Sequence, residues 1–85
     1  MDATLHGGIG LVDEDRSVRF YVNVDGRVWT CVIEGEALNQ LAGARATGDG
    51  LFDQFMENED AIVARVASAI ADGASSEPVL LRATA

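Results

Sequence analysis

VRFYVNVDGRVWTCVIE, from Val18 to Glu34, is the stretch that decides the fold of this chain. Two runs of β-branched and aromatic residues flank Asp25-Gly26, and this arrangement is the strongest short-range indication of a two-residue hairpin turn. Gly26 adopts a positive φ without steric cost, and Asp25 tolerates a positive φ better than most residues do. The stretch therefore predicts a β-hairpin over residues 18–34.

A two-residue turn determines which residues of the two strands lie opposite each other. On one face the pairs are apolar, and they are Val22 with Trp29, Phe20 with Cys31 and Val18 with Ile33. On the other face the pairs are mixed, and they are Asn23 with Val28, Tyr21 with Thr30 and Arg19 with Val32. Because side chains alternate along a strand, we expect the first face to lie in the core. The second face is half solvated or covered by another element.

Composition and charge describe one globular domain, residues 1–85, in which hydrophobic residues make up 48% and charged residues 24%. The chain has 14 acidic residues against 6 arginines and no lysine, which gives a net charge of −8. This charge disfavours nucleic-acid backbones and anionic membranes as partners, because a phosphate binder needs a basic patch, so we expect neither nucleic acid nor a membrane as a partner. The start of the chain has no signal-peptide pattern and no stretch is apolar enough for a membrane span, so a cytoplasmic location is expected.

Weaker patterns predict the elements around the hairpin. They are a flexible start at about 1–8, a short strand at Ile9–Val12, a short helix at about 36–42, a long helix at about 51–72 and a strand at 79–84. Both helices follow from apolar residues at helical spacing, and Pro78 is tolerated at the start of a strand. The predicted fold is α+β, a small antiparallel sheet that carries the long helix on one face.

Few residues are suited to catalysis. Cys31 is the only cysteine and lies on the core face of the hairpin, where a free cysteine behaves as a small apolar residue. His6, the only histidine, lies in the weakly patterned start. Asp53 and Glu57 have i, i+4 spacing, which is typical of a solvated helix face. We therefore predict no catalytic residue, no cofactor and no metal site, because metal and nucleotide motifs are missing as well.

The leading hypothesis is a binding or protein-interaction module without catalysis, and the alternative is a small enzyme or ligand-binding protein whose pocket is not visible in the sequence. The half-apolar second face of the hairpin offers Tyr21, Val28 and Val32 as candidate interaction residues. Two helices are too few to cover both faces of a sheet. We therefore expect a homodimer, formed through a sheet edge or exposed apolar surface, or contact with another protein.

Glu59 is the last candidate. On one continuous helix of about 100° per residue it falls on the apolar stripe. Either the helix lifts from the sheet there and Glu59 reaches solvent, or Glu59 pairs with a partner chain or with an arginine of the sheet, because an unpaired buried carboxylate is costly. The candidate arginines are Arg19, Arg27 and Arg82.

A series of landmarks runs through roughly residues 9–84, namely Val18-x-Phe20, Cys31-x-Ile33, Glu36-Ala37-Leu38, Phe55 and Asn58-x-x-x-Ile62. In this order the landmarks resemble a family of short bacterial proteins known only as a domain of unknown function, DUF1488. The resemblance implies a compact α+β bacterial domain and supplies no catalytic residue or cofactor. Such proteins often have an arginine where this chain has Glu59, so a role of that arginine does not carry over.

Overall fold

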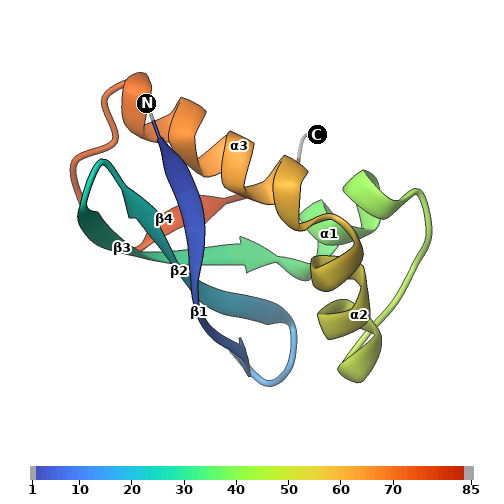
Figure 1. The fold of residues 1–85 in the computed structure, drawn as a ribbon. Coiled ribbons are helices and arrows are strands. Elements are labelled where there is room, and N and C mark those ends of the chain that lie inside the picture. Colours follow the sequence, from blue (N-terminus) through green and yellow to red (C-terminus); the bar gives the residue numbers. More distant parts are fainter. Residues whose placement is uncertain (1, 84–85) are drawn as a thin grey trace.

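The computed structural model describes residues 2–83, which form four strands and three helices arranged as a sheet with helices packed on it (Figure 1). In chain order the elements are β1 (Ala3–Val12), β2 (Ser17–Val24), β3 (Arg27–Glu34), α1 (Gly35–Ala42), α2 (Asp49–Glu57), α3 (Glu59–Ala71) and β4 (Val79–Leu81). The strands of these residues lie in the order β1-β2-β3-β4, so β1 and β4 are edge strands. The predicted α+β class is confirmed.

The hairpin of β2 and β3 forms in the predicted register, with Phe20 opposite Cys31. At its turn, Asp25 and Gly26 have φ values of 52° and 92°, as the favoured two-residue hairpin turns require. The side-chain oxygen of Asn23 accepts a hydrogen bond from the Gly26 N–H at 2.9 Å. Local chemistry at the turn is therefore sufficient to set this register.

Two predicted features of the last strand, its direction and its end, are wrong. β4 runs parallel to β3, with Val79 opposite Cys31, so the sheet is mixed instead of antiparallel. The chain leaves β3 and crosses the sheet through the helices before it returns, which is the long connection that parallel strands need. β4 also ends at Leu81, short of the strand predicted at 79–84, whose residue 84 lies outside the described residues.

β1 is longer than predicted, because it includes most of the segment 1–8, for which the sequence pattern shows no strand. Its register against β2 shifts between Leu5 and Gly7 and again between Gly7 and Gly10. Gly7 and Gly8 have φ values of 114° and 66°, a conformation that favours glycine. These bulges break the alternation of side chains. The sequence pattern therefore does not predict the first half of the strand.

The long helix predicted at about 51–72 is interrupted at Asn58 and forms the two helices α2 and α3. Asn58 has a φ of −116°, and its backbone N–H donates to the carbonyls of Gln54 and Phe55 at 3.1 Å each. Its side-chain nitrogen also donates to the Gln54 carbonyl, at 2.8 Å. Such local side-chain bonds compete with continued helix. The interruption resets the helical phase, so Glu59 opens α3 instead of continuing one apolar stripe.

The core lies between the helices and one face of the sheet. The rings of Phe20 in β2 and Phe55 in α2 have centroids 4.8 Å apart and are inclined by 60°, a tilted arrangement that aromatic pairs favour. The other large side chains that are almost completely buried are Val18, Val22, Cys31, Ile33, Leu38, Leu51, Ile62 and Val66. Sheet and helices thus contribute to one continuous core. Within residues 2–83, no helix is both long and apolar enough to cross a membrane.

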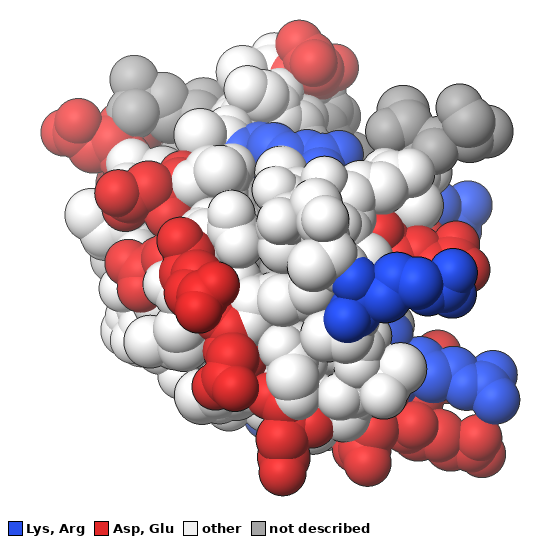
Figure 2. Space-filling model, turned by 90° about the vertical axis from the view of Figure 1, so that its right-hand side faces the viewer, with Lys and Arg blue, Asp and Glu red and all other residues white. Residues whose placement is uncertain are grey.

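Charge is distributed unevenly over the surface. Figure 2 shows acidic side chains in a row along one side of the view, while arginine side chains gather toward the other side. Acidic residues open both α2 and α3, where the positive end of the helix dipole favours negative charge. On the face in view, acidic side chains therefore form one side almost alone and mix with arginine on the other.

Candidate interaction surface

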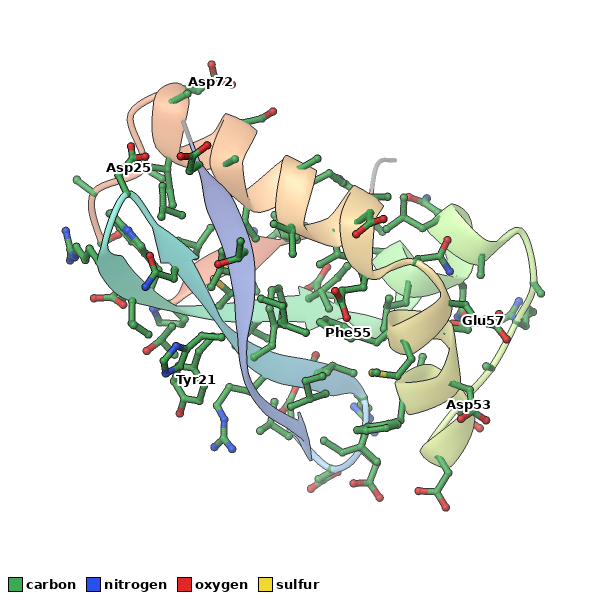
Figure 3. All side chains as sticks on the ribbon, in the orientation of Figure 1. Tyr21, Asp25, Asp53, Phe55, Glu57 and Asp72 are labelled. Atoms are coloured by element: carbon green, nitrogen blue, oxygen red, sulfur yellow. The ribbon has the colours of Figure 1, made fainter. Side chains whose placement is uncertain are left out.

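The face of the sheet turned away from the helices is left uncovered by residues 2–83, and we call it the open face. It is formed by Arg19, Tyr21 and Asn23 of β2, by Val28, Thr30, Val32 and the terminal Glu34 of β3, and by Leu80 of β4. Figure 3 shows Phe55 between the helices and the sheet and Tyr21 on the opposite side of the sheet. Val28 and Leu80 remain 40% and 41% exposed, although their strand neighbours Trp29 and Val79 are buried.

The predicted interaction residues Tyr21, Val28 and Val32 lie together on the open face. Tyr21 is opposite Thr30, so it is the diagonal neighbour of both valines across the β2–β3 pair. Val32 lies between Arg19 on one side and Leu80 on the other. An apolar group therefore extends from β2 to β4 across the sheet.

Tyr21 is supported by glycine in β1. A Cβ atom built on Gly8 would overlap ring carbons of Tyr21, so the ring occupies space that only glycine leaves free. The guanidinium carbon of Arg19 is 5.7 Å from the centroid of the same ring, within the range of a cation–π contact. The contacts with β1 and Arg19 hold the ring in place on the open face.

Arg19 has unused hydrogen-bonding capacity. Its Nε atom is buried without a hydrogen-bond partner among the described residues, and no ion pair of residues 2–83 includes its side chain. A Cβ atom on Gly10 would lie 3.4 Å from an Nη atom of Arg19, so the guanidinium also lies close to β1. An arginine with unpaired donors favours an acceptor from another molecule.

Glu77 closes the edge of β3 that β4 does not reach. Its Oε1 atom accepts the backbone N–H of Thr30 at 2.6 Å, and its Oε2 atom accepts a hydrogen bond from Arg27 at 3.3 Å. The guanidinium of Arg27 lies 3.9 Å from the ring centroid of Trp29. Because Glu77 accepts its hydrogen bond, the Thr30 N–H is not available for a strand of another molecule.

The two residues weighed for nucleophilic catalysis are kept apart. Cys31 is fully buried, as predicted, and its thiol donates to the Trp29 carbonyl at 3.6 Å. Burial raises the pKa of Cys31 to about 11, and the charge of Glu77 acts in the same direction. His6 is exposed on β1, with β2 between its strand and β3. A protonated thiol without a base is a poor nucleophile.

The remaining acidic candidates also stay separate. Asp53 and Glu57 are exposed and lie on the outer side of α2, away from Phe55 (Figure 3). No group of three histidine, cysteine, aspartate or glutamate residues within the described part of the chain is placed to hold a metal ion.

Glu59 is half-buried in the first turn of α3. No ion pair within residues 2–83 joins it to any of the three candidate arginines, Arg19, Arg27 and Arg82, and Arg27 pairs with Glu77 instead. Pairing with a partner chain stays a prediction. Together with Asp60, Glu59 lines a groove beside β1.

Leu80 on the open face and Gly8 beneath the Tyr21 ring were not recognised as candidates from the sequence. Leu80 alternates with the buried Val79 and Leu81, and this alternation is a usable signal once β4 is known to pair with β3. Gly8 acts only through Tyr21, so it becomes visible only when the register of β1 is known.

Comparison with known proteins supports the fold. A family model described as "Protein of unknown function (DUF1488)" matches residues 9–81. A crystal structure of a protein of unknown function from the DUF1488 family of Shewanella loihica PV-4 aligns with a TM-score of 0.75 at 15% sequence identity, over 98% of this chain and 94% of that chain. At this identity the likeness shows the fold alone. The search of curated proteins finds no match.

Proposed function

The chain belongs to the DUF1488 family of proteins of unknown function, and we propose that it is a protein-interaction module that acts through the open face of its sheet. The observation that carries this proposal is the apolar group on that face, where Val28 and Leu80 are each about two-fifths exposed. A sheet with one solvated face normally presents polar residues there. A contiguous apolar patch on the surface of a small domain instead marks a contact site.

The occupant that we propose is a second copy of this chain. By the alternation of β3, Glu34 lies on the same face as Val32, so the open face carries one arginine and one carboxylate, Arg19 and Glu34, although the chain as a whole carries a net charge of −8. Among the strand residues of this face only Glu34 is acidic, so two copies stacked through it bring few carboxylates of the face itself together. The contact also covers an aromatic ring, that of Tyr21, and aromatic residues are enriched at interfaces. A chain of this size has a small core and gains stability from association.

The alternative of a small enzyme has less support. The hollow between the β1–β2 turn, α1 and the loop before α2 has a volume of about 560 Å³ and is lined by Glu14, Arg16 and Arg45 among others. Glu14 and Arg16 face each other at 3.9 Å, and their side chains are 84% and 78% exposed. Catalytic sites hold convergent polar groups in partly buried positions. The open face therefore favours the interaction module.

Sedimentation velocity over a range of protein concentrations tests this proposal. We expect a species with twice the 9.0 kDa mass of the chain. Leu80→Arg should shift this species to the monomer, because it places a charge within the apolar group of the contact. Met56→Arg is the matched control, since Met56 is 48% exposed on α2 and lies outside the open face.

A monomer at all concentrations overturns the proposal, as does a dimer that Met56→Arg disrupts and Leu80→Arg leaves intact. Far-UV circular dichroism of both variants establishes that they are folded.

A further inference from the structure

A groove with a volume of about 560 Å³ lies between the free edge of β1 and α3, and we call it the edge groove. Residues 3–5 of β1 form one wall. The opposite wall is formed by α3, where Val63 and Ala64 provide apolar surface and Glu59 and Asp60 provide two carboxylates. Figure 1 shows β1, drawn in dark blue, running from the N-terminus beside α3. The edge groove is separate from the open face, which lies on the other side of the sheet.

The β1 wall of the groove is an unpaired strand edge. Among the described residues only β2 pairs with β1, and Ala3, Thr4 and Leu5 keep a regular antiparallel register with it. Their outward backbone groups are therefore free, and such an edge is a template for a further strand. The register breaks after Leu5, at the bulge around Gly7, so the template is short. Lysine and proline, which protect many edge strands, are missing from residues 2–12.

The α3 wall determines which side chains fit. Ala64 is small, and Val63 is nearly buried, so the middle of the groove accepts an apolar side chain from above. Glu59 and Asp60 take part in no ion pair within residues 2–83. Two adjacent carboxylates next to an apolar floor complement a lysine or arginine that neighbours an apolar residue.

A second copy of this chain does not meet this requirement. The matching segment at its own β1 edge, residues 2–10, contains Asp2 and His6 but no lysine or arginine. Two chains of net charge −8 would bring their acidic grooves together. The occupant must be another molecule with positive charge.

We propose that the edge groove binds an extended, basic segment of a different protein, which adds to β1 as a strand. Its backbone pairs with residues 3–5, and alternate side chains point toward α3, because side chains alternate along a strand. An apolar side chain then lies over Ala64, and a lysine or arginine lies beside Glu59 and Asp60. In this mode backbone hydrogen bonds supply affinity, and the pockets beside the strand supply specificity.

A labelled peptide of alternating valine and lysine residues is the probe, and its binding to the whole chain is measured by fluorescence anisotropy at physiological salt. The double variant Glu59→Gln with Asp60→Asn should weaken binding roughly tenfold, because it removes two charge-assisted contacts. The matched control is Asp53→Asn with Asp72→Asn, which changes the net charge equally at exposed positions outside the groove. The control should retain the affinity of the unmodified chain.

Strand addition has two further readouts. Bound peptide should slow the hydrogen exchange of the amides of residues 3–5, and a peptide methylated on alternate backbone nitrogens should not bind. Equal weakening by both double variants would reduce the effect to general charge attraction and overturn the proposal. Failure of the valine–lysine peptide to bind, binding of the methylated peptide, or unchanged exchange at residues 3–5 would overturn it too. Leu80→Arg changes the open face and leaves the edge groove intact. Peptide binding to this variant therefore tests the edge groove separately from dimer formation through the open face.

Discussion

The ring of Tyr21 lies directly over Gly8, in space that a Cβ atom at position 8 would occupy. Gly8 also has a φ of 66°, in the left-handed region that favours glycine. Two independent physical reasons therefore require glycine at this position, one in the backbone and one in the packing of the open face. A double-mutant cycle separates them.

Gly8→Ala should lower the free energy of unfolding by about 2–4 kcal/mol, as the sum of backbone strain and overlap with the ring. On a Tyr21→Ala background the overlap is gone, and the same substitution should cost only about 1–2 kcal/mol. Urea denaturation of the four proteins measures the difference. Equal losses on both backgrounds would show that the ring does not depend on Gly8.

Substitution of Glu77 tests which of its contacts stabilises the edge of β3. Glu77→Ala removes the charge-assisted bond to the Thr30 N–H and the exposed ion pair with Arg27. The first contact is short and has a charged acceptor, while the second contributes little in solvent. We expect a loss of about 1–3 kcal/mol in the free energy of unfolding. Arg27→Ala should cost less than Glu77→Ala, and the reverse order would assign the stabilisation to the ion pair and to the contact with Trp29.

The hairpin was predictable in full because its determinants are local. Asp25-Gly26 selects the turn, and alternation then assigns each side chain between residues 18 and 34 to a face. The candidates Tyr21, Val28 and Val32 follow from the same alternation and lie together on the open face. What the sequence could not show is that residues 2–83 leave the open face uncovered, because this depends on how the helices pack.

Three features of the fold could not be predicted. The direction of β4 depends on contacts between residues far apart in the sequence, and the bulge in β1 and the break at Asn58 are local exceptions to a regular pattern. The direction of β4 is set by the crossover that precedes it, and nothing in Val79–Leu81 encodes it. The bulge at Gly7 removes the period of two from β1. Asn58 fits a helical pattern by spacing, yet its side chain bonds to the Gln54 carbonyl at the point where α2 ends.

Substitution of Glu59 tests whether its carboxylate stabilises the fold of the isolated chain or is free to bind another molecule. Because it is half-buried and makes no ion pair within the described residues, Glu59→Ala should change the free energy of unfolding by less than about 0.5 kcal/mol. A loss of roughly 3 kcal/mol or more would instead indicate a buried ion pair. Thermal and urea unfolding of the isolated chain measure this. The matched control is Asp60→Ala, which removes the neighbouring exposed carboxylate in the same helical turn.

The raised pKa of Cys31 leads us to predict a loss of folding stability in alkaline solution. Its pKa is raised from 9.0 to about 11, mainly by burial, so the folded chain holds the thiol proton more tightly than the unfolded chain does. The resulting stabilisation is complete below pH 9.0 and is lost as the pH rises toward 11, by up to about 2–3 kcal/mol.

Other groups titrate in the same range, so the relevant quantity is the difference in pH dependence between the unmodified chain and Cys31→Ala. The cavity left by the alanine lowers stability at every pH but does not change the slope. Iodoacetamide labelling gives a second measurement, because the buried thiol should react slowly at neutral pH and faster in denaturant. Parallel pH curves for the two proteins, together with rapid labelling of the folded chain, would contradict a buried Cys31 and return it to the candidates for a reactive residue.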